Sequence, residues 1–186
     1  NALGSDAFAA SSAALNYEYF AYYLVNAFAQ TVVTFTGQNY GAGKPERIWM
    51  GVKVSALMMI IYWAFTFCVL MLGARTFALL FVEASELEIL KDTELFLHIS
   101  VSFFPVLGLL CILRYTIQGA GYTNLAMLSG VSEMIARVLV SLYAVPAFGY
   151  LAVCFGDPTA WIAAVLFLVP AFIFVYRRLL RMRREQ

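Results

Sequence analysis

The stretch that most constrains the fold runs from Val54 to Leu72 and holds no charged residue over nineteen positions. As a helix it would be about 28 Å long, which is enough to cross the hydrocarbon core of a bilayer. The whole chain is 63% hydrophobic and only 12% charged, and so few charges cannot cover the surface of a soluble domain. The sequence therefore predicts an all-α polytopic membrane bundle with lipid as its solvent.

Further stretches have the length and composition of membrane spans. Pro105 interrupts one of them, and we expect a kink there, which membrane helices tolerate where a neighbouring helix or water satisfies the freed carbonyl. Asp157 before Pro158 is predicted to cap the last helix. We expect one membrane domain over residues 1–186 with five transmembrane helices, at approximate spans 8–36, 46–73, 94–117, 124–149 and 158–177.

Two glycine-containing turns separate these helices. In Thr36–Arg47, Gly41 and Gly43 permit the left-handed backbone that ends a helix, and Pro45 suits the first position of the next helix. The stretch Gly119–Asn124 is a weaker version of the same turn. Each is predicted to join two membrane helices at a membrane surface.

Basic residues fall mainly on one side of the predicted topology. Nine lie on the side of the two glycine turns and the C-terminus, and only Arg75 and Lys91 lie on the other. Because cytoplasmic loops carry the excess of Lys and Arg, we expect the turns and the C-terminus of a multi-pass plasma-membrane protein to be cytoplasmic. With five helices and a cytoplasmic C-terminus, the N-terminus would lie outside the cell. A missing helix before Asn1 would complete an even set of six and place the start of the lobe in the cytoplasm. The nine are Lys44, Arg47, Lys53, Arg114, Arg177, Arg178, Arg181, Arg183 and Arg184.

Polar side chains at membrane depth are the candidate functional residues. Glu133 and Arg137 are four residues apart, so their side chains share one helix face about 15 Å or more from the start of that helix. This arrangement fits an internal ion pair that fixes helix packing. The alternative is a pair that lines a substrate or proton path, and burial alone does not separate the two because both roles need inward-facing side chains.

Two other pairs have the same spacing. Asn26 and Gln30 fit either hydrogen bonding between helices or the lining of a cavity. Arg114 and Gln118 lie at the cytoplasmic end of the third predicted helix. We expect Arg114 to extend its guanidinium to the membrane interface rather than to bind substrate.

Several classes of protein find no support in the sequence. The three cysteines lie in apolar runs without metal or disulfide spacing, and His98 is the only histidine, so no metal site is predicted. No hydrolase, metalloprotease or phosphate-loop motif is present, so we expect neither an enzyme nor a cofactor. The basic residues do not cluster on a soluble face, which speaks against nucleic-acid binding.

Three motifs resemble those of the multidrug and toxic compound extrusion (MATE) transporters, and the resemblance extends over essentially the whole chain. Thr34–Lys44 reads TFTGQNYGAGK and is similar to the family's vGQNxGAGk hairpin. Gln118–Gly121 resembles its qGxG turn, and Ser132–Arg137 resembles its E-x-x-x-R element. Their order and spacing also agree with the family.

The resemblance implies a fold and an activity. Family members have two six-helix lobes around a central cavity, so this chain would be the C-terminal lobe without its first helix. They exchange protons or sodium for organic, mostly cationic, compounds. We expect Asn26, Gln30, Glu133 and Arg137 to line the substrate or ion path. The residues expected to form a hinge or gate are Gln38, Asn39, Gly41, Gly43, Gln118, Gly119 and Gly121.

The sequence departs from one branch of the family. Sodium-coupled NorM-like members carry an acidic residue about a dozen positions before the second glycine turn. Here that region reads Pro105-Val106-Leu107-Gly108, without a carboxylate. We therefore expect the coupling site for H⁺ or Na⁺ to lie outside this chain.

The function we expect is secondary antiport that exports small organic cations. The expected partners are the lipid bilayer, the organic cation and the missing N-terminal lobe of the same polypeptide. One alternative is a flippase for lipid-linked oligosaccharides of the same superfamily, which would need several cations for a pyrophosphate. Another is a structural subunit of a membrane complex that does not transport.

Overall fold

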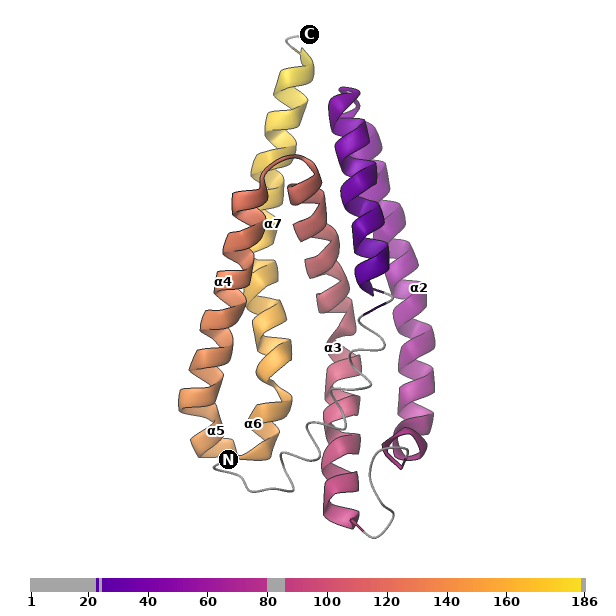
Figure 1. Cartoon of the computed structure of the whole chain (residues 1–186), viewed down its shortest axis with the longest axis vertical. Helices are drawn as coiled ribbons and strands as arrows, with labels where there is room; N and C mark the ends of the chain where they lie inside the picture. The colour runs from indigo at the N-terminus through magenta and orange to yellow at the C-terminus, as the bar shows by residue number, and fades with distance from the viewer. Residues whose placement is uncertain (1–22, 24, 80–85, 185–186) are drawn as a thin grey trace.

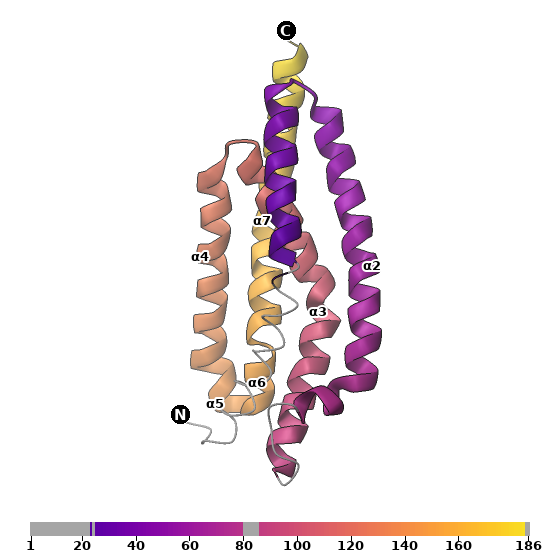
Figure 2. The same cartoon turned by 45° about the vertical axis from the view of Figure 1, so that its right-hand side comes forward.

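The computed structural model describes residues 23, 25–79 and 86–184, with side chains up to residue 181. This part of the chain is helical and contains no strand. A first helix over residues 25–41 precedes the other elements (Figures 1 and 2). These are α2 (Pro45–Ala78), α3 (Leu87–Gly119), α4 (Thr123–Leu139), the π-helical turn η1 (Val140–Ala144), α5 (Val145–Phe148), α6 (Tyr150–Cys154) and α7 (Gly156–Arg184).

Within the described residues, four helical stretches are long and apolar enough to cross a membrane: Pro45–Ala78, Leu87–Gly119, Thr123–Phe148 and Gly156–Arg181. The all-α polytopic bundle predicted from the sequence is thus confirmed. Of the predicted span 8–36, residues 8–22 and 24 lie outside the described residues, and residues 25–36 belong to the first helix. Figure 1 shows both glycine turns at the same end of the bundle as the end of α7.

Helix α4 is built for a lipid solvent. Its buried positions include Ser129 and Glu133. Met127 and Met134 on its other face are exposed, as is Leu142 just after its end. A helix in water has the reverse arrangement, with its apolar stripe inward. The outward apolar face therefore marks the surface that meets lipid or another apolar partner.

Helix α3 lies at the centre of the bundle and packs against α2, α4 and α7. Its buried side chains recur along its whole length, from Leu90 to Ile117, and on more than one face. Phe104 contacts Trp161 of α7 edge-on, with 6.2 Å between the ring centroids. Because three helices pack on it, the position of α3 fixes where the polar residues of the other helices meet.

Pro105 lies inside α3 and removes the amide that would bind the carbonyl of Val101, four residues earlier. The indole Nε1–H of Trp63, on α2, donates to this carbonyl oxygen at 2.9 Å. The expectation that a neighbouring helix would satisfy the freed carbonyl is therefore confirmed. Since the bilayer core offers no water to replace this bond, it ties α2 to the middle of α3.

Two backbone hydrogen bonds close the first glycine turn, each from an amide beyond the helix end to a carbonyl of its last turn. The amide of Lys44 donates to the carbonyl of Asn39 at 2.9 Å, and that of Gly43 to Tyr40 at 3.0 Å. This is a Schellman motif, and its left-handed residue is Gly43, with φ of 65°. Gly41 has no positive φ and is the last residue of the first helix, so a left-handed role for Gly41 is wrong. Pro45 opens α2, as predicted.

The second glycine turn repeats this geometry. The amide of Tyr122 donates to Ile117 at 3.1 Å, and that of Gly121, with φ of 87°, donates to Gln118 at 2.9 Å. The second turn resembles the first only weakly in sequence but has the same backbone structure, because a Schellman motif requires only one residue that tolerates positive φ.

The two turns also bring their glycines together. A Cβ added to Gly119 would lie 2.6 Å from the carbonyl oxygen of Val33 and 2.8 Å from Cβ of Thr36. A Cβ on Gly37 would lie 3.5 Å from the carbonyl oxygen of Gly119. The first helix and α3 thus cross closely at glycine, as small residues allow in membrane helices.

The hairpin at the opposite end is irregular. Helix α4 passes into the π-helical turn η1 just before Pro146, and Gly149 adopts φ of 60°. Helix α7 begins at Gly156, so Asp157 lies inside its first turn. The prediction that Asp157 is the N-cap of this helix is wrong, because its carboxylate is bound to a side chain of α4 instead.

Replacing Trp63 by Phe removes the donor and leaves the Val101 carbonyl without its partner. We expect a loss of about 1–3 kcal/mol in the free energy of unfolding, the usual cost of an unsatisfied buried polar group. Denaturant unfolding in detergent micelles measures this loss. The matched control is Tyr62→Phe, which alters the adjacent residue and leaves the Trp63 donor in place. Equal stability of the two variants would contradict the role assigned to Trp63.

Replacing Gly119 by Ala forces its Cβ against the backbone of the first helix. We expect destabilisation by about 1–3 kcal/mol, as for other overpacked contacts. Gly130→Ala is the control, because a Cβ there meets nothing within 4 Å and the helix gains propensity. Thermal unfolding should therefore show a lower midpoint for Gly119→Ala and an unchanged or higher one for Gly130→Ala. The reverse order would exclude the close crossing.

Candidate functional site

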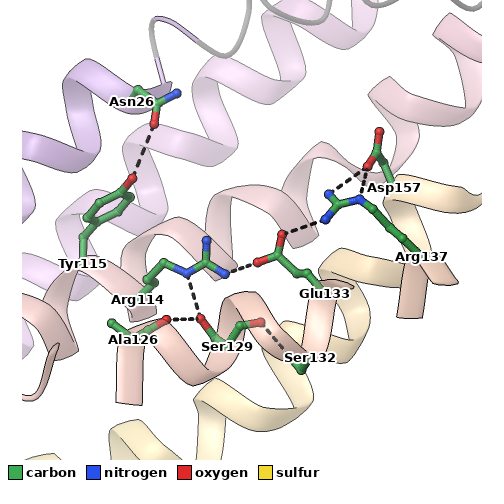
Figure 3. Close-up of polar contacts among 9 residues, drawn as sticks. All are labelled: Asn26, Arg114, Tyr115, Ala126, Ser129, Ser132, Glu133, Arg137 and Asp157. Atoms are coloured by element: carbon green, nitrogen blue, oxygen red, sulfur yellow. Dashed lines mark hydrogen bonds and ion pairs between the residues drawn. The ribbon is translucent and has the colours of Figure 1, made fainter. Parts of the chain in front are cut away.

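Glu133 lies at the centre of a network of charged side chains that joins three helices (Figure 3). Its Oε1 accepts a hydrogen bond from Nη2 of Arg114, on α3. Its Oε2 lies 3.4 Å from Nη1 of Arg137, one turn later on α4. The side chain of Glu133 is only 11% exposed, so both arginines compensate a largely buried negative charge.

Arg114 points into the bundle toward α4. Its Nε donates to Oγ of Ser129 at 2.8 Å, and this buried hydroxyl donates in turn to the carbonyl of Ala126 at 2.7 Å. The expectation that Arg114 extends to the membrane interface is therefore wrong. Its guanidinium instead binds a buried carboxylate and a buried hydroxyl on the neighbouring helix.

Arg137 continues the network to α7. Its Nε and Nη2 both lie 2.8 Å from Oδ1 of Asp157. The side chains of Arg137 and Asp157 are 42% and 28% exposed, so this end of the network is more open than Glu133. Asp157 therefore serves as a tether between α4 and α7.

The four charges alternate in sign along the network, in the order Arg114, Glu133, Arg137, Asp157. Two positive and two negative groups cancel, so the network carries no net charge. Such balance lowers the cost of placing ions in a medium of low dielectric constant, and losing one member leaves its partner uncompensated. Glu133 and Arg137 do meet as their spacing predicts, but Glu133 also binds an arginine of another helix.

The two residues of the predicted pair on the first helix have different surroundings in the structure. Oδ1 of Asn26 lies 3.4 Å from the hydroxyl of Tyr115, the neighbour of Arg114, which places Asn26 beside the network (Figure 3). Gln30 is exposed and is not brought to the network. The first helix therefore contacts α3 through Asn26, at the residue that follows Arg114.

The predicted hinge or gate residues lie in the two turns. Nδ2 of buried Asn39 donates to the carbonyl of Phe35 at 2.8 Å, within its own helix. Gln38 and Gln118 are exposed. The glycines of these turns have backbone roles: Gly43 and Gly121 adopt positive φ, and Gly119 packs against the first helix.

A separate apolar pocket lies between the first helix and α2. It is lined by Val25, Phe28, Met58, Met59 and Tyr62. This lining provides aromatic rings and polarisable thioethers but no ionised group. Within the described residues no cluster of His, Cys, Asp and Glu is suited to hold a metal ion.

Ser129 and Asp157 were not identified as network residues from the sequence. The contact of Ser129 with Arg114 could have been predicted from the sequence. In an antiparallel helical hairpin centred on Gly121, position 129 lies nearly opposite position 114. The Arg137–Asp157 pair had no such signal, because the irregular hairpin between α4 and α7 breaks the register.

Comparison with known proteins gives the family. The profile of the MatE family matches residues 1–143 of this 186-residue chain. All three motifs, at Thr34–Lys44, Gln118–Gly121 and Ser132–Arg137, lie inside the matched region. No curated protein matches the chain in a sequence search. Since the match spans well over half of the chain, the chain belongs to the MatE family, the multidrug and toxic compound extrusion transporters.

Proposed function

We propose that this transporter is a secondary antiporter that exports small, mostly cationic organic compounds in exchange for protons or sodium ions. The observation that supports this proposal is the charge balance of the network. Arg114 of α3 and Arg137 of α4 are each bound to a carboxylate. No excess of positive charge is left there to repel an organic cation.

The same observation makes a flippase for lipid-linked oligosaccharides the weaker candidate. A pyrophosphate group needs several cations that are free to form hydrogen bonds with its oxygens. Arg114 donates from Nε to Ser129 and from Nη2 to Glu133, and Arg137 donates to Glu133 and Asp157. A pyrophosphate would therefore compete with these carboxylates for both positive charges.

Glu133 and Arg137 form part of the proposed path, together with Asn26 and Gln30 of the first helix. Arg137 and Asp157 form the more exposed end of the network, and Asn26 lies beside its more enclosed end. Transient release of Glu133 from one arginine would expose a carboxylate to a passing cation. The described bundle would act as the C-terminal lobe of a two-lobe transporter in the plasma membrane, with the glycine turns cytoplasmic.

The proposed hinge is the contact between the glycine turns. Gly119 lies against the backbone of Val33 and Cβ of Thr36 on the first helix, and the two helices would pivot at this close contact. The driving force is an ion gradient, since one charge that crosses the membrane gains about 2.3 kcal/mol per 100 mV. The coupling carboxylate is proposed to lie in the other lobe.

The proposal is tested with the full-length, two-lobe polypeptide, by efflux of a fluorescent organic cation from cells or proteoliposomes under an imposed proton or sodium gradient. Glu133→Gln keeps the shape of the side chain but removes its charge, so Arg114 loses its counter-ion. We expect efflux to fall about tenfold or more, which corresponds to about 1.4 kcal/mol in the transport barrier. The control is Glu88→Gln, at an exposed carboxylate in the first turn of α3.

Two results would contradict the proposal in different ways. Folded wild-type protein without gradient-driven efflux of any tested cation would exclude cation export. Normal efflux by Glu133→Gln would instead remove Glu133 from the path and leave its ion pairs a purely structural role.

A paired substitution separates the path from the packing. Arg114→Met alone leaves Glu133 with one arginine, and we expect a loss of stability of about 3 kcal/mol. Arg114→Met combined with Glu133→Leu removes both charges, keeps Arg137 paired with Asp157, and should unfold close to the wild-type midpoint. If Glu133 lies on the path, this stable double variant does not transport. Wild-type efflux by the double variant would show that the pair serves packing alone.

A further inference from the structure

The apolar pocket between the first helix and α2 has the size of a single ring. Met58, Met59 and Tyr62 line it from the charge-free stretch of α2, and Val25 and Phe28 line it from the first helix. Its cavity volume is about 140 Å³. An engineered apolar cavity of about 150 Å³ in another protein binds benzene or xenon. The pocket therefore has room for one six-membered ring.

The lining of the pocket is buried on one side and exposed on the other. Val25 is only 3% exposed. The thioether of Met59 lies against α3, because a Cβ added to Gly108 would be 2.8 Å from Cε of Met59. Met58 is 51% exposed, so the lining reaches the surface of the bundle at this residue. A ligand therefore has access to the pocket from outside the bundle, beside Met58.

The chemistry of the lining favours an uncharged aromatic ring. None of the described lining residues is ionised, so a charged ligand would find no counter-ion at this depth. A lipid acyl chain gains little by leaving the bilayer, because lipid tails are as apolar as the side chains of the lining. An aromatic ring gains additional contacts with the rings of Phe28 and Tyr62 and with the sulfur atoms of the two methionines.

We propose that this pocket binds one uncharged aromatic ring of a small molecule dissolved in the membrane. The ring contacts Phe28 and Tyr62, and the flexible side chain of Met58 closes over it. The site is distinct from the charged network, which joins α3, α4 and α7, and it does not depend on the proposed export of cations. Because the ligand contacts both the first helix and α2, its binding stabilises the packing of these two helices.

Binding is measured by NMR of the full-length polypeptide in detergent micelles, with ¹³C in the methionine methyl groups. Fluorobenzene is compared with fluorocyclohexane, which has a six-membered ring without π electrons. We expect fluorobenzene to shift the methyl signals of Met58 and Met59 more than that of Met127, an exposed residue of α4 that reports partition of the probe into the micelle. Fluorobenzene should bind about fivefold more tightly than fluorocyclohexane, the effect of one aromatic pair.

Substitutions in the lining test where the ring binds. Phe28→Leu removes one aromatic contact and keeps the site apolar, so the preference for fluorobenzene over fluorocyclohexane should largely disappear. Tyr62→Leu makes the equivalent change on the other helix and replaces the first variant if that variant does not fold. The matched control is Phe65→Leu, at an exposed position of α2 outside the lining, which should bind both probes like the wild type.

Three outcomes would overturn the proposal. Equal affinity of the wild type for the two probes would show an apolar cavity without preference for an aromatic ring. Equal shifts at Met58, Met59 and Met127 would show partition into the micelle alone. An unchanged preference in Phe28→Leu and in Tyr62→Leu would place the ring outside this pocket. None of these measurements involves efflux, so a failure of the proposed cation export would leave them unaffected.

Discussion

A polar group inside this bundle is stabilised by a partner within the protein, because the hydrocarbon core supplies no water. Three sets of groups have such partners in the structure. Trp63 binds the carbonyl that Pro105 leaves free, paired backbone bonds close both glycine turns, and the charges at depth are matched one to one. The helices are therefore positioned by polar contacts, while their apolar faces provide most of the packed area.

The charged network specifies which helices are neighbours. Apolar side chains pack against lipid tails about as well as against each other, so packing alone does not fix the rotation of a membrane helix. Glu133 can satisfy its two oxygens only if α3 and α4 present Arg114 and Arg137 to it together. Arg137 and Asp157 then set the position of α7 relative to α4. The network thus constrains three helices, and in the proposed function its central carboxylate lies on the substrate path.

The predictable part of the fold followed from patterns along one helix. Apolar length gave the spans, glycine gave the turns, and a four-residue spacing gave the Glu133–Arg137 pair. Contacts between helices were not predictable in this way, because α3 is apolar on every side and its sequence does not reveal which face meets α2 or α4. Taken from the sequence alone, Trp63, Arg114 and Asp157 can each be explained by a role on their own helix. Each instead binds a group on another helix.

The hydrogen bond from Trp63 gives Pro105 a further consequence. In a membrane helix the carbonyl that a proline leaves free can be satisfied within the same helix, by water or by a neighbouring helix. Here its partner lies on α2, so a change in the angle of α3 at Pro105 either breaks this bond or carries α2 along. As long as the bond holds, flexing of α3 at this point becomes a joint displacement of two helices.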